Sequence, residues 1–204
     1  MIMKLRILAA VAALLVTAAC GDNQAADPAP TPTKATTASP TAIASGEPVP
    51  KKLDIAPGRI GAVKVGMTKA EAAATGYFDT DVEVGGDVCN RVEPLQWKKF
   101  YEDQVDVLTD DAGSIVSMGV RKGLKTDKGI TVGSTLGQVN SAYGDTVSPA
   151  QKAGYDQAGV FVTDGDKWLG FLVNETWNDV TPSSKVTFIE VTEGSKPDLM
   201  RDGC

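Results

Sequence analysis

The sequence predicts an α+β fold of two tandem repeats, each a short helix packed on an antiparallel sheet of about three strands. A motif of the form apolar-x-Val-Gly-x-Thr occurs twice, at residues 63–68 and 130–135. A short helical stretch follows each copy and stops at a glycine. Each half then closes with a similar strand-like run, at residues 115–123 and 186–194. We therefore expect repeat 1 at residues 51–127 and repeat 2 at residues 128–204.

Residues 1–19 have the layout of an export signal. A start with two cations precedes an apolar run from Ile7 to Ala19. At about 13 residues, that run is shorter than the roughly 20 that cross a bilayer. It ends in Thr17-Ala18-Ala19-Cys20-Gly21, which resembles the lipobox of bacterial lipoproteins, with Thr17 where Leu is usual. We expect cleavage before Cys20 and acylation there, including palmitate. An ordinary secretory signal that leaves a free thiol is the alternative.

Residues 20–50 are rich in Ala, Thr, Pro and Ser and lack hydrophobic periodicity. Such a segment cannot bury enough apolar area to offset the cost of ordering, so we expect a disordered tether. At up to roughly 3 Å per residue, it would reach some tens of ångström from the membrane. Acyl chains on Cys20 contribute about 0.8 kcal/mol per buried CH₂, so the anchor would be effectively permanent. The expected location is the extracytoplasmic side of the cell membrane.

The two helices are predicted from their capping residues. Thr68 and Thr135 stand at N-cap positions, where a hydroxyl accepts a backbone N–H of the first turn. Glu71 and Gln138 each follow by three residues, so each helix should begin with a capping box. Each helix should stop at a glycine in the left-handed conformation, Gly76 or Gly144. A helix of nine or ten residues is marginal alone and must pack on a sheet.

The strands are predicted from apolar alternation between turn residues. In the first half, the candidates are residues 97–101, 104–109 and 115–123. In the second half, they are residues 159–163, 167–173 and 186–194. The Asp-Gly pair between the first two of these is a strong hairpin signal.

Composition and charge exclude several classes of function. The 204 residues carry 20 Lys and Arg against 26 Asp and Glu, and this net charge of −6 argues against a nucleic-acid partner. The chain has no histidine, which removes Ser/His/Asp and Cys/His catalysis and histidine-based zinc sites. Neither a cofactor nor a metal site is predicted.

One of the three cysteines is expected to be acylated, and the other two could form a disulfide. With Cys20 acylated, Cys89 and Cys204 form an even pair in an exported chain, where the compartment permits oxidation. A disulfide between them would close a loop of about 116 residues and add up to roughly 4–5 kcal/mol in the chain-entropy model. Two free thiols, one of them reactive, are the alternative.

Aromatic residues are the candidates for a binding surface. They gather near residues 97–101 and again near residues 168–177. Trp168 and Phe171 differ by three positions, so in one strand they would face opposite ways. Exposed Trp and Tyr commonly anchor contacts with proteins or glycans. The candidate binding residues are Trp97, Tyr101, Trp168 and Trp177. The alternative is that most of these side chains belong to the core.

Acidic residues offer a weaker signal. Asp79, Asp81 and Glu83 alternate, so they would line one face of a strand, and they lack the loop pattern of a calcium site. Asp164 and Asp166 flank a glycine in a predicted turn, where Asp is expected for backbone reasons. A pair of carboxylates could serve a hydrolase, but spacing alone is weak evidence for it.

The stretch Val65-Gly66-Met67-Thr68-Lys69-Ala70-Glu71 resembles the repeat start of the β-lactamase inhibitor protein and of small outer-membrane assembly lipoproteins of the SmpA/OmlA type. The resemblance implies helix-then-three-strand units that bind other proteins and are not enzymes. The second copy has Ser134 in place of Met and Gly137 inside its helix. None of the inhibitor's binding residues carries over, so the resemblance bears on fold and class alone.

Two functions of different classes follow. The first is a membrane-tethered, non-enzymatic module that binds an extracytoplasmic protein or an envelope component through its sheet. The second is a cell-envelope hydrolase that works with carboxylates. The lack of histidine and of a nucleophile motif favours the first.

Overall fold

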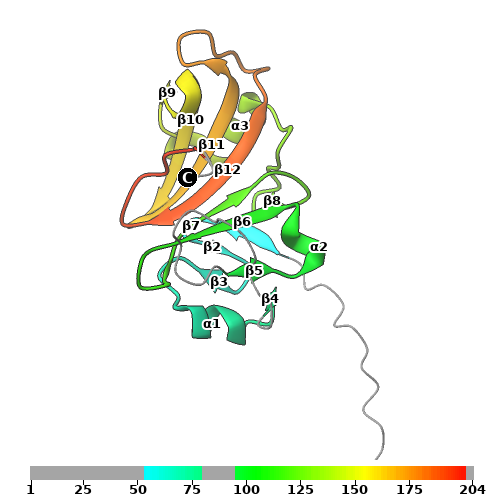
Figure 1. Ribbon diagram of the computed structural model, residues 1–204. Coiled ribbons are helices and arrows are strands. Elements are labelled where there is room, and N and C mark those ends of the chain that lie inside the picture. Colours follow the sequence, from blue (N-terminus) through cyan, green and yellow to red (C-terminus); the bar gives the residue numbers. More distant parts are fainter. Residues whose placement is uncertain (1–52, 80–94, 201–204) are drawn as a thin grey trace, which may run out of the picture. The chain divides into compact units, whose positions relative to one another are not determined.

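The computed structural model describes residues 53–79 and 95–200, which all belong to one compact unit, Glu47–Cys204. The predicted export signal and tether, Cys20, Cys89 and Cys204 lie outside the described residues. The elements follow in chain order (Figure 1): β1 Asp54–Ala56, β2 Arg59–Ile60, β3 Val63–Lys64, α1 Lys69–Ala74, β4 Phe78–Asp79, β5 Gln96–Trp97, α2 Lys99–Glu102, β6 Val105–Thr109, β7 Ile115–Val120, β8 Lys125–Thr126, α3 Leu136–Tyr143, β9 Gln151–Lys152, β10 Gln157–Asp164, β11 Lys167–Thr176 and β12 Val186–Glu193.

The described strands form three sheets. The largest is antiparallel, with the order β6-β7-β12-β11-β10-β9. A second sheet has the order β3-β2-β1-β8, in which β1 and β8 run parallel. Strands β4 and β5 form a separate antiparallel pair. The last strand in the chain, β12, therefore lies in the middle of the large sheet and joins the hairpin β6–β7 to the hairpin β10–β11.

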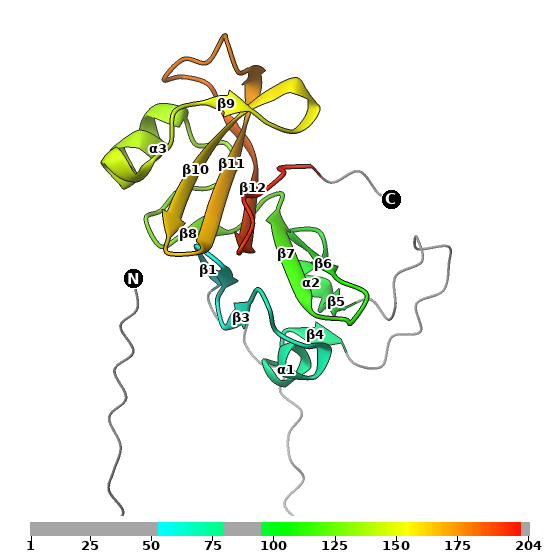
Figure 2. The same ribbon diagram turned by 90° about the vertical axis from the view of Figure 1, so that its left-hand side faces the viewer.

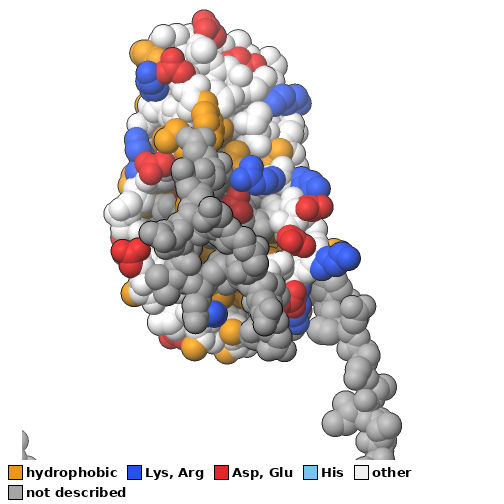
Figure 3. Space-filling view, in the orientation of Figure 1, with side chains coloured by type: hydrophobic (Ala, Val, Ile, Leu, Met, Phe, Trp, Pro, Cys, Tyr) orange, Lys and Arg blue, Asp and Glu red, His pale blue; other side chains and the backbone are white. Residues whose placement is uncertain are grey.

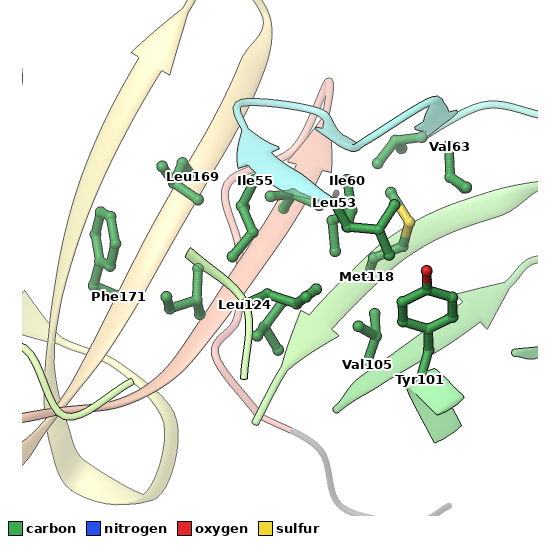
Figure 4. Packing of buried hydrophobic residues seen from close by; sticks show 14 of the residues in the cluster. Leu53, Ile55, Ile60, Val63, Tyr101, Val105, Met118, Leu124, Leu169 and Phe171 are labelled. Atoms are coloured by element: carbon green, nitrogen blue, oxygen red, sulfur yellow. The ribbon is translucent and has the colours of Figure 1, made fainter. Parts of the chain in front are cut away.

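One hydrophobic core lies against one face of the large sheet. Leu169 and Phe171 of β11 and Met118 of β7 contribute from the sheet, and Ile55 and Ile60 contribute from the second sheet; all five side chains are fully buried. Figure 4 shows these groups converging between the two layers. Helix α3 lies on the same side of β10–β12, and the C-terminal segment lies on the opposite side (Figure 2). Residues from both halves of the chain thus share a single core.

Both predicted capping boxes are confirmed. At α1, Glu71 N donates to the Thr68 hydroxyl at 3.3 Å, and Thr68 N donates to the Glu71 carboxylate at 2.9 Å. At α3, the corresponding distances for Thr135 and Gln138 are 3.1 and 2.8 Å. Gly76, just beyond α1, has a φ of +80°, the conformation that ends a helix. Gly144 has a φ of +59°, and there α3 passes into a short 3₁₀ helix, Gly144–Thr146.

The predicted α+β class is confirmed, but a repeat of one helix and three strands is not evident. The first half contributes two strands to the large sheet, and the second half contributes four. The helices, of six and eight residues, are shorter than predicted. Residues 97–101 do not form one strand, because β5 ends at Trp97 and α2 begins at Lys99. The two halves therefore differ in the elements that lie between their helix and their last strand.

The halves nevertheless make the same hydrogen bonds where the sequence motif recurs. Gly66 N donates to the carbonyl of Ile115 at 2.7 Å, and Ile115 N donates to the carbonyl of the residue after Gly66 at 2.8 Å. Gly133 and Val186 make the corresponding pair of bonds at 2.8 and 2.9 Å. Each motif is thus tied to the first residue of the strand that closes its half.

A membrane-spanning helix is not found within residues 53–79 and 95–200, where every helix is too short or too polar to cross a bilayer.

Candidate binding face of the large sheet

The face of the large sheet that points away from the core is the candidate site. Alternation along the paired strands places on it three cross-strand rows, which we call the open face. The rows are Leu108–Ser117–Thr192–Trp168–Thr163, Asp106–Gly119–Glu190–Gly170–Phe161, and Phe188–Leu172–Gly159. Figure 3 views this side of the molecule and shows hydrophobic side chains gathered over the upper strands, with charged side chains around them.

A buried carboxylate stands at the centre of the open face. Glu190 of β12 is only 3% exposed, and its strand neighbours in the central row are Gly119 and Gly170. One carboxylate oxygen accepts the Ser117 hydroxyl at 2.5 Å, and the other accepts the backbone N–H of Leu199 at 2.7 Å. Buried carboxylates require such donors, since an unpaired charge away from water is costly. Glu190 therefore accepts hydrogen bonds both from the sheet and from the C-terminal segment.

Residues Ser195–Met200, which we call the strap, cross the open face. A turn connects the end of β12 to the strap. In this turn, Gly194 N donates to the Asp166 carbonyl at 2.8 Å. The Thr192 hydroxyl then donates to the Ser195 carbonyl at 2.5 Å. Pro197 and Leu199 are buried, while the alternate residues are exposed. The strap thus presents Pro197 and Leu199 to the sheet, while its polar side chains and Met200 reach solvent.

Leu199 fills a socket in the open face. Its side chain is fully buried and belongs to a small cluster with Phe161, Leu172 and Phe188, separate from the main core. Glycines make the room. A Cβ at Gly159 would lie 2.8 Å from Leu199 Cδ1, and a Cβ at Gly170 would lie 3.0 Å from Leu199 Cδ2.

Gly154, just after β9, closes the end of the socket. A Cβ there would lie 2.4 Å from the Leu199 carbonyl oxygen, so only glycine lets the strap come this close. The φ of Leu199 itself is +56°, a conformation that L-residues with a branched side chain seldom adopt. The close fit and the unusual backbone together indicate that the strap is held in one defined position.

Cations lie at the margins of the open face. Arg121 pairs with Asp106 at 3.0 Å and stands over the Phe188 ring, 5.6 Å from its centroid. Lys196 of the strap stands over the Phe161 ring at 4.9 Å and donates to the Gln151 side chain at 3.0 Å. These aromatic rings therefore bind cations on their outward sides while they line the socket.

Two of the four predicted binding residues lie in the main core and not at the surface. Trp97 and Tyr101 are 3% and 5% exposed and pack with Tyr77 and Phe78 in the main core. The Phe78 and Trp97 ring centroids are 4.4 Å apart, and those of Trp97 and Tyr101 are 6.1 Å apart. Their rings serve to cover the α1 end of the core, so they cannot anchor a partner at the surface.

The other two predicted binding residues reach the surface at different places. Trp168 is half-buried on the open face, where its ring meets Phe161 edge-on at 6.4 Å. Phe171, three positions further along the strand, points into the main core. Trp168 and Phe171 therefore face opposite ways, as their spacing predicts. Trp177 is 45% exposed, just after β11 ends at Thr176. Trp168 is thus the one predicted binding residue that lies on the open face.

The acidic residues do not converge in the described part of the chain. Asp79, Asp164 and Asp166 are all exposed, and Asp81 and Glu83 lie outside the described residues. No cluster of three potential metal-binding side chains occurs among the residues that the structure describes. A surface depression at the start of α3 is lined by Lys128, Ser134 and Ser141 among others, without a carboxylate, and it includes the capping residues Thr135 and Gln138.

Sequence reasoning did not identify Glu190, Leu199 or the glycines around them. A weak signal was present in residues 196–199, where polar Lys196 and Asp198 alternate with apolar Pro197 and Leu199. The placement of Glu190 between two glycines depends on strand register, which the sequence pattern does not specify across distant strands.

No protein-family model, no curated protein and no solved structure matches this chain. The case for function therefore rests on the residues and their geometry.

Proposed function

We propose that this protein is a lipid-anchored, extracytoplasmic binding module that engages a protein or an envelope component through the open face. The observation that carries the proposal is the open face itself. It is the outer side of a six-stranded sheet whose other side packs on the core, and it bears a half-buried Trp168 and a socket for an apolar side chain. The part of this face that reaches solvent carries Trp168, and tryptophan with charged groups nearby is typical of protein recognition sites.

The sequence supports the location. The lipobox-like run before Cys20 and the Pro- and Thr-rich residues 20–50 would tether a folded module at some distance from the membrane surface. A tether of this kind suits a protein that meets its partner in the space beside the membrane. It brings the module near the surface while leaving it free to turn.

The hydrolase alternative draws less support from the described residues. Asp164 and Asp166 lie at the exposed β10–β11 turn, where the backbone of Asp166 serves to hold Gly194. The buried carboxylate of Glu190 is engaged by Ser117 and Leu199. A carboxylate pair around a pocket would be needed for glycoside hydrolysis.

We also propose that the two halves are divergent copies of one unit. The support is the matching capping boxes and the matching bonds of Gly66 with Ile115 and of Gly133 with Val186. The closing strands β7 and β12 are also neighbours at the centre of the large sheet, where they pair antiparallel. In this account the copies diverged in the strands between helix and closing strand.

Site-specific photo-crosslinking tests the binding function. A photoreactive residue at Thr163 or Leu108 of the open face, in the full-length protein in its own membrane, should give a discrete crosslinked species. The matched control is the same residue at Asn140 or Lys128, exposed positions at or near α3 on the core side of the sheet. Equal crosslinking from both sides, or none from the open face, would contradict the proposal.

A further inference from the structure

We propose that the socket on the open face is a peptide-binding site that the chain occupies with its own strap, and that a partner docks by replacing the strap with an extended segment carrying a leucine-like side chain. This inference rests on the proposed binding function and specifies the chemistry of the partner. The strap supplies the evidence for that chemistry, because its contacts define what the site accepts.

The strap contacts the sheet as a bound peptide does. It does not pair with a sheet edge, and it lies across the middle of a face that is already fully hydrogen-bonded within the sheet. Two of its hydrogen bonds to the open face involve its backbone: the Ser195 carbonyl accepts the Thr192 hydroxyl, and the Leu199 N–H donates to Glu190. Backbone contacts combined with one side-chain pocket are the usual means of recognising an extended peptide.

The socket belongs to the sheet and not to the strap. Its floor consists of Gly159 and Gly170, and its walls are the rings of Phe161 and Phe188 with Leu172. Two glycines in sheet strands weaken those strands, because they lack side chains to pack. Their presence beside an apolar cluster fits a surface shaped for the close approach of another segment.

Glu190 makes the site selective. Its carboxylate is almost fully buried and accepts the N–H of Leu199 at 2.7 Å. When the strap leaves, that oxygen loses a donor in a site bounded by apolar rings. A segment that replaces the strap would reproduce its contacts by supplying both an apolar side chain and a backbone N–H. An apolar small molecule or a lipid chain would fill the socket but would not replace the N–H that Leu199 donates to Glu190.

The strap competes with the partner because it is attached to the site. A short linkage gives such a segment an effective concentration in the millimolar range, so the free protein holds its site closed. A partner then binds with an apparent affinity lowered by the fraction of time that the strap occupies the site. Weakening the strap should increase the affinity for a peptide added in trans.

The test uses a fluorescent peptide, Gly-Ser-Lys-Pro-Asp-Leu-Met, which has the sequence of residues 194–200. Its binding to the full-length protein in detergent is measured by fluorescence anisotropy for the wild type, Leu199→Ala and the matched control Asp198→Ala. A reductant is present, so that the predicted disulfide at Cys204 cannot hold the end of the strap. Asp198 is the exposed neighbour of Leu199 in the strap. We expect Leu199→Ala to bind the peptide about tenfold more tightly than the wild type or more, and Asp198→Ala to match the wild type. A peptide with Ala in place of Leu should not bind.

Equal binding by the wild type and Leu199→Ala, or equal binding of the Leu and Ala peptides, would overturn the inference. Hydrogen exchange in the wild type decides the case if Leu199→Ala does not fold. The strap amides should exchange through a local opening, faster than those of β11 and β12. Exchange only with global unfolding would show the strap to be a fixed part of the fold. If the crosslinks from Thr163 form but the peptide does not bind, the strap proposal fails and the binding function stands.

Discussion

At the scale of single residues, the two N-caps offer a matched pair within one chain. Thr68 and Thr135 make the same bonds to residues three positions on, and these partners are a glutamate and a glutamine. The two caps therefore have the same geometry, and only one of them carries a charge.

Replacement of either threonine by alanine should lower the free energy of unfolding by about 1 kcal/mol, because one backbone N–H loses its acceptor. The two helices lie in different halves of the chain, so the losses should add in the double variant. Urea unfolding followed by circular dichroism measures this. A double variant that loses no more than either single one would contradict the independence of the caps.

A fall in pH should weaken the capping box of α1 but not that of α3. Backbone and side-chain hydrogen bonds from Thr68 hold the pKa of Glu71 below its usual value of 4.5. The contribution of a carboxylate with a lowered pKa is present above its unfolded pKa and is lost as the pH falls through the folded one. Glu71→Gln should therefore lose less stability than the wild type between pH 6 and pH 3.

The reverse substitution, Gln138→Glu, provides the control for this effect. It should add a component of stability that disappears over the same acidic range, because it gives α3 the cap that α1 has. Unfolding by urea at a series of pH values compares the three proteins. Identical pH profiles for Glu71→Gln and the wild type would show that the Glu71 bonds do not contribute.

At the scale of elements, short sequence patterns predicted those helices and strands that depend on residues close together in the chain. The capping boxes, the hairpin β10–β11 and the closing strands β7 and β12 were all predicted from residues near one another in sequence, and the structure has them. The region of residues 97–101 was not. There, the need to bury Trp97 and Tyr101 against Tyr77 and Phe78 outweighs the strand-like pattern, and the chain turns into α2.

The sequence patterns did not predict the strap, for a different reason. The strap contains no helix or strand and no turn motif. Its position depends on glycines in β10 and β11 and on a carboxylate in β12. These residues come together only once the strand register is established. The open face could therefore be anticipated as a sheet surface, but its socket could not.

Loss of the Leu199 side chain should destabilise the protein more than loss of the side chain of its exposed neighbour, Asp198. Leu199→Ala empties a fully buried socket and should lower the free energy of unfolding by about 2–3 kcal/mol. Asp198→Ala should change it by less than about 0.5 kcal/mol. Urea unfolding of both variants measures the difference. Equal small effects would mean that the strap contributes little to the stability of the native state.

At the scale of the whole molecule, the main core draws on both halves of the chain. Ile55 and Ile60 of the first half pack with Leu169 and Phe171 of the second, and β7 of the first half pairs with β12 of the second. Neither half encloses its hydrophobic residues alone, since the closing strands of both meet at the centre of the large sheet.

The predicted disulfide would link two residues outside the described ranges. Mass spectrometry of non-reduced protein from the envelope should find a peptide cross-linked between Cys89 and Cys204, because the proposed extracytoplasmic location would permit oxidation of this even pair. Both cysteines recovered as free thiols would rule the bond out. The Cys89→Ser/Cys204→Ser protein is the control for nonspecific oxidation.

Lipidation at Cys20 also makes a direct prediction. The Cys20→Ala protein should stay uncut and lose the acyl modification, which mass spectrometry of the N-terminal peptide would detect. The cleaved and acylated wild type should fractionate with membranes. If Cys20→Ala is processed as the wild type is, the cut belongs to an ordinary secretory signal.

The central place of β12 has a consequence for how the chain folds. All the other strands of the sheet precede it in the sequence, yet β7 and β11 each depend on it for a neighbour. While the chain is being made, these two strands therefore lack one neighbour until residues 186–193 have been added. Bare edges pair readily with other chains, so the molecule passes late through a stage at which aggregation competes with folding. A chaperone that shields β7 and β11 would protect it during this stage, and a chain cut short before β12 would never leave it.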